Sequence, residues 1–188
     1  MKQVLKCGQL FLAREKRFAA DQNVYVEDGR ITAVSSGPVQ EGWEVVDLGG
    51  KYVLPGLIDC HVHVNMNGEP ATDYMSKQTI GDSTITAICN AQSDLMAGFT
   101  TIRDEGSVFF TDIAVRDAIN AGKIDGPRMF CSGIPIGTTG GHADSNFNPY
   151  ITGDTSMGFI IDSPDEGRKA ARLNLKYGAD QIKIMATG

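Results

Sequence analysis

The sequence of 188 residues contains no run of about 18 consecutive apolar residues, the length that a membrane-spanning helix needs. Its first residues, Met1–Arg14, lack the pattern of a signal peptide. Lysine and arginine total 17 against 23 aspartates and glutamates, and neither sign forms long runs. Nucleic-acid binding requires a basic face, which this distribution does not provide. We therefore expect neither a membrane nor a nucleic acid as a partner.

Paired cysteines are also missing, since the four cysteines lie far apart and form no C-x-x-C motif. This spacing is typical of free thiols in a reducing compartment, so we expect a cytoplasmic protein. The glycine-rich segment 137–141 lacks the G-x-x-x-x-G-K-[ST] pattern of a phosphate-binding loop. Hydrophobic residues make up 41% of the chain, which is enough to build a core and argues against disorder.

Residues 1–50 are rich in short runs of β-branched and aromatic residues between turn signals, which predicts a small β-sandwich-type module. The dipeptide Asp28-Gly29 between two of these runs is a strong hairpin signal. No catalytic group of residues occurs within the module. The expected strands are Gln3–Phe11, Asn23–Glu27, Arg30–Val34 and Trp43–Asp47.

Residues 51–188 alternate between strand and helix patterns, which predicts an α/β fold with a parallel sheet, either a barrel or a doubly wound sheet. Glycines follow each expected helix, as is usual at helix ends. The expected strands are Tyr52–Val64 (interrupted by Pro55-Gly56), Phe99–Asp104, Pro127–Ile134 and Ala179–Met185. The expected helices are Asp82–Ala97, Thr111–Ala121 and a segment from the Ser163 cap to Tyr177.

The sharpest local feature is the pair His61 and His63 at the end of an apolar strand. Side chains alternate between the two faces of a strand, so the two imidazoles share one face while Cys60 and Val62 share the other. Two imidazoles on one face can reach a single metal ion. The plain alternative is a pair of hydrogen-bonded core histidines. Cys60 faces away from the histidines, so a nucleophilic role is not expected for it.

Lys183 is the second candidate for a functional residue. Side chains alternate along the expected strand, so Ile182 and Ile184 would face the helices and Lys183 would face the inside of the sheet. An inward-facing ammonium is costly unless it is neutralised or paired. Lys183 is therefore either a chemically active amine or the partner of a carboxylate such as Asp59 or Asp104, and the residues alone leave both open.

Two further residues stand at the ends of expected strands. His142 follows a glycine-rich loop and is either a substrate contact or a loop histidine that satisfies backbone groups. Asp104 ends the second strand of the α/β region and either orients a ligand histidine or caps a loop.

The segment from Pro55 to His63 resembles the first-strand signature of the amidohydrolase superfamily. The segments 103–106, 139–142 and 181–184 resemble its prolidase-like and imidazolonepropionase-like branch. The resemblance implies the first half of a (β/α)8 TIM barrel, with the N-terminal part of a small β module in 1–50 and the first four β/α units in 51–188.

The resemblance also implies a ligand set and a reaction. His61 and His63 would bind one of two divalent metal ions, expected to be zinc, and Lys183 would carry a CO2-derived carbamate that bridges them. A metal-bridging hydroxide would then attack an amide, so Lys183 would be both a metal ligand and a catalytic residue. His142 would contact the substrate, expected to be a dipeptide or an N-acyl amino acid, as in a dipeptidase or carboxypeptidase-like enzyme.

The family pattern needs two more histidines and an aspartate, whereas the chain has only three histidines in all. A complete barrel takes about 250 residues. We therefore expect the 188 residues to be inactive alone and to require the C-terminal half of the barrel as partner. A homo-oligomer is compatible with such a barrel. The alternatives are an imidazolonepropionase-like hydrolase of a cyclic amide and a non-catalytic metal-binding remnant.

Overall fold

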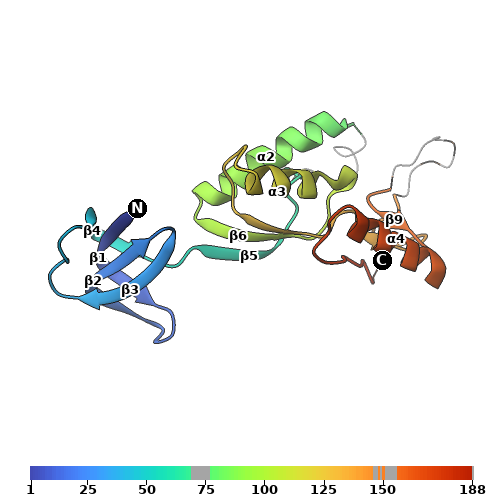
Figure 1. Ribbon diagram of the computed structural model, residues 1–188. Coiled ribbons are helices and arrows are strands. Elements are labelled where there is room, and N and C mark those ends of the chain that lie inside the picture. Colours follow the sequence, from blue (N-terminus) through green and yellow to red (C-terminus); the bar gives the residue numbers. More distant parts are fainter. Residues whose placement is uncertain (69–76, 146–147, 149, 151–155, 188) are drawn as a thin grey trace. The chain divides into compact units, whose positions relative to one another are not determined.

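The computed structural model describes residues 1–68, 77–145, 148, 150 and 156–187 (Figure 1). The chain divides into two compact units, Met1–Pro55 and Gly56–Gly188. The sequence placed this division between residues 50 and 51. The difference arises because the last strand of the first unit continues to Val53.

The first unit is one four-stranded sheet in the order β3-β2-β1-β4. Antiparallel pairing joins β1 to β2 and β2 to β3, whereas β1 and β4 are parallel. Asp28 and Gly29 form the predicted hairpin with φ values of 49° and 74°. The strands are β1 (Lys2–Leu12), β2 (Arg17–Glu27), β3 (Arg30–Ser36) and β4 (Glu44–Val53).

All four expected strands of this unit are present, but they lie in a single sheet. The second layer of a sandwich is not found among the described residues of the unit. Cys7, Leu10 and Val24 form the apolar cluster on the sheet. Tyr25 packs edge-on against Trp43 with ring centroids 4.9 Å apart. Adjacent residues of a strand point to opposite faces, so Val24 and Tyr25 are buried on the two different faces of the sheet.

The second unit contains a three-stranded parallel sheet in the order β5-β6-β7, with two helices in the connections (Figure 1). Its core joins helix residues such as Ala87 and Ile113 to strand residues such as Ile102 and Met129. The expected bounds of β6 are confirmed, whereas β5 and β7 are shorter than expected and Tyr52 belongs to β4. The elements are β5 (Leu57–Val62), α2 (Ile80–Met96), β6 (Phe99–Asp104), η1 (Val108–Phe110), α3 (Thr111–Asn120) and β7 (Arg128–Cys131).

Local sequence explains where α2 begins and ends. Thr79 accepts a hydrogen bond from the Asp82 backbone N–H, and the Asp82 side chain accepts one from the Thr79 backbone, which completes a capping box. The helix is followed by Gly98 at a φ of 100°, a conformation that glycine adopts without a steric penalty. The predicted start at Asp82 differs because the cap lies at Thr79.

A smaller parallel pair, β8 (Ile136–Gly137) and β9 (Phe159–Ile160), precedes helix α4 (Pro164–Lys176). The Ser163 cap of α4 is confirmed, because its hydroxyl accepts a hydrogen bond from the Glu166 N–H. The β8–β9 pair was not predicted, since two residues are too few to show a strand pattern.

The expected strand Ala179–Met185 is wrong as a strand. The segment makes one isolated parallel bridge, between Ile136 and Ile184. Its neighbour β7 ends at Cys131, and Gly133 at a φ of 68° turns the chain, so no continuous ladder is offered to the segment. Backbone hydrogen bonds from Ile136 N to Lys183 O (2.9 Å) and from Met185 N to Ile136 O (2.8 Å) hold it in place.

The predicted free thiols are confirmed, with Cys7 and Cys131 buried and Cys60 and Cys89 exposed. Within the described ranges, no helix combines the length and the apolar composition that crossing a membrane requires.

Candidate active site

The two histidines of the H-x-H pattern lie side by side at the end of β5. Their ring centroids are 5.3 Å apart, and the ring planes make an angle of 68°. The Asp59 carboxylate accepts a hydrogen bond of 2.9 Å from the His61 backbone N–H, which fixes the strand just before the pair. His61 is exposed and His63 is partly buried. The extended backbone therefore brings both imidazoles to one place, as the parity of the sequence predicted.

His63 is held by a backbone carbonyl from the next strand's loop. Its Nδ1 lies 2.9 Å from the carbonyl oxygen of Gly106. A carbonyl can only accept a hydrogen bond, so Nδ1 carries the proton and Nε2 presents a lone pair. The pKa of His63 is lowered, first by burial, while the Gly106 bond acts in the opposite direction. The neutral ring with a free Nε2 is the form that binds a metal.

Asp104 fixes the loop that carries this carbonyl. Its Oδ1 accepts the Gly106 N–H at 2.9 Å, and its Oδ2 accepts the Val64 N–H at 2.8 Å. The side chain is fully buried. Burial, and then the neighbouring Asp112, raise the pKa of Asp104 to about 7, although the two N–H groups oppose this. Asp104 thus caps the loop, and Gly106 stands between it and His63.

Lys183 lies beside Glu105, where the sequence named Asp59 or Asp104 as candidate partners. Its Nζ is 3.8 Å from Glu105 Oε2, and the two side chains are 20% and 13% exposed. Asp104 is not available as a partner because its oxygens are taken by backbone N–H groups. The inward direction of Lys183 agrees with its parity, even though the segment is not a regular strand.

Two neighbours orient Glu105 independently of the lysine. Arg103 Nε lies 2.7 Å from Oε1 and also donates to the Cys60 carbonyl oxygen at 2.8 Å. Gln181 Nε2 donates to the same Oε1 at 3.1 Å. Sequence reasoning assigned no role to Glu105 or Gln181. A usable signal was present, because Gln181 shares the parity of Lys183.

His142 lies in a turn after β8 and is exposed. The turn is built by Gly140, whose N–H donates to Asp144 at 2.8 Å, and by Thr139, whose hydroxyl donates to Asp162 at 2.6 Å. No interaction in the described part of the chain joins His142 to His61 or His63. Its role as a substrate contact stays a prediction.

The donor set supports part of a metal site. Two imidazoles with a fixed Nδ1 proton can fill two positions of a zinc ion, which takes four ligands. In the ranges that the structure describes, no three His, Cys, Asp or Glu side chains gather closely enough to hold a metal. His61 and His63 fit as nitrogen ligands, with Lys183 near His63 as a third group. A carbamate on this lysine would add oxygen donors.

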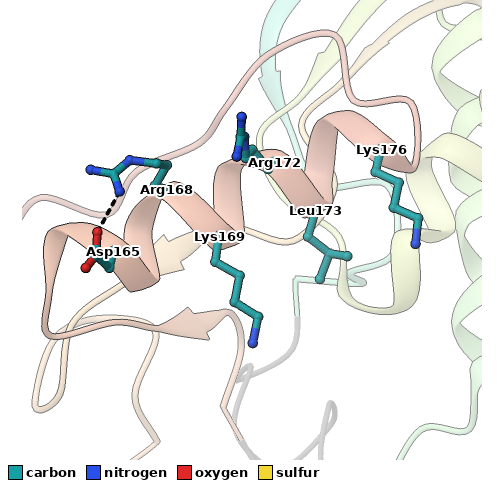
Figure 2. Close-up of a pocket in the computed structure, with 6 residues that line it drawn as sticks. All are labelled: Asp165, Arg168, Lys169, Arg172, Leu173 and Lys176. Carbon is teal, nitrogen blue, oxygen red and sulfur yellow. Dashed lines mark hydrogen bonds and ion pairs between the residues drawn. The ribbon is translucent and has the colours of Figure 1, made fainter.

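Among the described residues of the second unit, one groove lies beside His63 and another lies on α4. The first groove is lined by His63 together with Asn90, Ser93 and Asp94 of α2. The other lies on α4 and presents cations on an exposed helix face (Figure 2). Within it Asp165 pairs with Arg168 at 2.6 Å. This second groove is lined by Asp165, Arg168, Lys169, Arg172, Leu173 and Lys176. None of these residues belongs to the cluster of His61, His63 and Lys183.

Comparison with known proteins decides the family. Residues 52–188 match the model of the amidohydrolase family. The chain belongs to the amidohydrolase family. Ochratoxinase of Aspergillus niger is 33% identical over 155 residues, which are 72% of this chain and 31% of that protein. Dihydroorotase of Bacillus thuringiensis is 34% identical over 102 residues, 54% of this chain and 21% of that protein.

Solved structures of amidohydrolases agree with this assignment. A prolidase crystallised with N-methylphosphonate-L-proline superposes with a TM-score of 0.89 at 30% identity, covering 100% of this chain and 47% of the prolidase. The chain therefore has the fold of the first half of an amidohydrolase TIM barrel with its preceding β module. It spans about half the length of that prolidase and 31% of ochratoxinase.

Proposed function

We propose that the full-length protein is a metal-dependent amide hydrolase that acts on a dipeptide or an N-acyl amino acid. The observation that carries the proposal is the His61 and His63 pair with Nε2 of His63 left free by its bond to Gly106. The similarity to a prolidase over the whole chain and to ochratoxinase over 72% of it supports the amide substrate.

In this proposal His61 and His63 hold one divalent cation of a pair, expected to be zinc. When bound, such a pair polarises a carbonyl group and lowers the pKa of water to about 7. Gly106, held by Asp104, keeps His63 in the metal-binding tautomer and position. The exposed His142 contacts the substrate's carbonyl or carboxylate oxygen.

Lys183 completes the protein's contribution as a carbamate. Its amine nitrogen adds to the carbon of CO2, a C–N bond forms, and an N–H proton leaves to solvent. The product is an anion with two oxygen donors, which suits a bridge between two cations. The position of Lys183 supports this role, because its side chain is largely buried and its charge acts on the neighbouring His63 ring.

A cyclic amide is the second candidate substrate. The 34% identity to dihydroorotase favours it, but this match covers 54% of the chain, less than the match to ochratoxinase. Lys183 argues against two other possibilities. A centre with one metal ion needs no bridging carbamate, and a non-catalytic remnant need not keep this lysine.

The test is metal analysis of the full-length protein together with a panel of dipeptides, N-acyl amino acids and cyclic amides. About two zinc ions per chain and release of the C-terminal residue from a dipeptide are expected. Opening of a cyclic amide without dipeptide cleavage would support the second candidate. Absence of bound metal would favour a non-catalytic scaffold. The 188 residues produced alone should show no hydrolysis.

A further inference from the structure

We propose that Phe109 is a specificity-determining residue whose ring contacts an apolar side chain of the substrate beside the scissile amide. The inference rests on the proposed function, because it assigns the class of side chain that the same site accepts. It concerns the loop between β6 and α3, which contains neither the histidine pair nor Lys183.

The loop lies at the edge of the sheet where β5 ends with its histidines. Parallel strands bring their C-terminal ends to one edge, and in a TIM barrel the loops at that edge form the active site. Phe109 follows Gly106 by three residues, and the Gly106 carbonyl oxygen lies 2.9 Å from His63 Nδ1. A chain advances at most about 3.6 Å per residue, so Phe109 lies within about 11 Å of Gly106. A phenyl ring and a bound dipeptide together can bridge this distance.

Hydrogen bonds on two sides fix the course of the loop. The Ser107 hydroxyl donates to Asn65 Oδ1 at 3.2 Å, and the Ser107 N–H donates to the Gly133 carbonyl oxygen at 2.9 Å. Ser107 and Asn65 are both buried. Asn65 itself lies two residues after His63, so the loop is joined to the chain that follows the histidine pair. Phe109 is therefore presented by a fixed backbone.

The two adjacent aromatic residues of the loop have opposite surroundings. Phe110 packs against the main core, and its ring centroid lies 4.6 Å from that of Tyr177, whereas Phe109 is 48% exposed. Both have left-handed backbones, which are unfavourable for residues other than glycine. The packing of Phe110 offsets its strain, but the burial of Phe109 offsets little. Strained residues gather at ligand-binding sites, so the exposed ring of Phe109 is assigned to binding.

The groups already placed at the site are polar or charged. Glu105 and Lys183 form an ion pair there, and the two imidazoles complete the cluster. Such groups suit the amide and the terminal charges of a substrate, whereas an apolar side chain needs an apolar lining. A phenyl ring supplies this surface at a low cost in conformational entropy, because it has few rotatable bonds. Phe109 therefore favours leucine and phenylalanine side chains over those of glycine and alanine.

The experiment measures kcat/KM of the full-length protein for two series of dipeptides. One series varies the N-terminal residue and the other the C-terminal residue, through glycine, alanine, leucine and phenylalanine. In one of the series Phe109→Ala should lower kcat/KM about tenfold or more for the leucine and phenylalanine members and less than twofold for the glycine member. Phe109→Leu should keep part of the preference. Phe18→Ala, at a residue 42% exposed in the first unit, is the matched control and should leave the ratio unchanged.

Binding provides a readout that needs no turnover. Calorimetric titration of the full-length protein should give a dissociation constant about tenfold lower for N-acetyl-L-phenylalanine than for N-acetylglycine. Phe109→Ala should remove this difference, and Phe18→Ala should keep it. Phe109→Gly also removes the ring but relieves the backbone strain, so it serves as the second variant if Phe109→Ala does not fold.

The outcomes separate the ring from the backbone and the inference from the proposed function. Equal loss of the preference in Phe109→Ala and Phe109→Gly supports a contact made by the ring. Loss in Phe109→Gly alone, or unchanged ratios in both variants, would overturn the inference. If the unmodified protein shows the binding preference but hydrolyses no amide of either series, the proposed function fails while the contact of Phe109 with an apolar group stands.

Discussion

The carbonyl oxygen of Gly106 accepts the hydrogen bond of His63 Nδ1 at 2.9 Å. These residues are 43 positions apart in the chain, and the contact joins the end of β5 to the loop after β6. It decides which ring nitrogen of His63 is free. The loop itself depends on Asp104, so one buried carboxylate acts on His63 through a single peptide group.

Gly106→Ala should disturb His63 directly. Gly106 has a φ of 136°, and a Cβ there would lie 3.0 Å from Pro135 Cγ. The new side chain therefore meets both backbone strain and a steric contact, with a cost of about 1–3 kcal/mol. We expect a lower unfolding midpoint and weaker zinc binding. Gly140→Ala is the control, since Gly140 has a φ of 72° and open space around it. Equal zinc affinities in both variants would contradict the role of Gly106.

Stability should fall as the pH rises from about 4 to about 7, because of Asp104. Its pKa rises from an ordinary 3.8 to about 7 in the folded protein, so the folded state holds the proton more tightly. This contribution is complete below the unfolded pKa and is lost as the pH passes the folded pKa, at about 1.4 kcal/mol for each pH unit. Urea unfolding between pH 4 and 8 measures it.

Asp104→Asn should reduce this pH dependence, and the part that remains is expected from Asp112, whose pKa is also raised, mainly by burial. Asp162 provides a control of opposite sign, because hydrogen bonds from Thr139 lower its pKa. A group of that kind contributes stability above its unfolded pKa and loses it as the pH falls through the folded pKa. Asp162→Asn should therefore leave the decline between pH 4 and pH 7 in place. An unchanged slope in Asp104→Asn would show that another group is responsible.

Phe109→Gly should leave the free energy of unfolding unchanged or raise it by up to about 1 kcal/mol. Phe109 and Phe110 adopt φ values of 60° and 57°, a left-handed conformation that is unfavourable for aromatic residues. Phe109 is 48% exposed, so its ring contributes little burial to offset the strain. Chemical denaturation of the full-length protein gives the comparison.

Phe110→Gly relieves the same strain but removes a packed ring. The centroid of Phe110 lies 4.6 Å from that of Tyr177, and Phe110 packs against the main core. We expect a net loss of about 2 kcal/mol or more. Similar effects in both glycine variants would mean that backbone strain alone controls this loop.

Asp180→Ala should loosen the segment that carries Lys183. Asp180 Oδ2 accepts hydrogen bonds from Arg116 Nη1 at 2.8 Å and from the Cys131 N–H at 2.9 Å. Removing the carboxylate leaves these donors without that partner, which costs about 1–3 kcal/mol. Thermal unfolding and zinc titration should both report the change. Asp165→Ala, at an exposed pair with Arg168, should affect neither. Full zinc affinity in Asp180→Ala would show that the segment does not need this anchor.

The amino-acid sequence determined the features that depend on neighbours in the chain. The alternation of strands and helices, the cap at Ser163 and the shared face of His61 and His63 all follow from short-range patterns. They hold because side-chain direction in a strand and hydrogen bonding at a helix end are set within a few residues.

The tertiary structure decided the contacts between distant segments. The alternation of side chains along the segment predicted that Lys183 faces inward. Its partner, which is Glu105 and not Asp59 or Asp104, depends on how the segments pack. Asp104 had already been taken by the backbone N–H groups of Val64 and Gly106. The segment 179–185 has a strand's composition but forms a single bridge, because its neighbour turns away. Such outcomes depend on which hydrogen-bond partners remain free once the sheet and helices have packed.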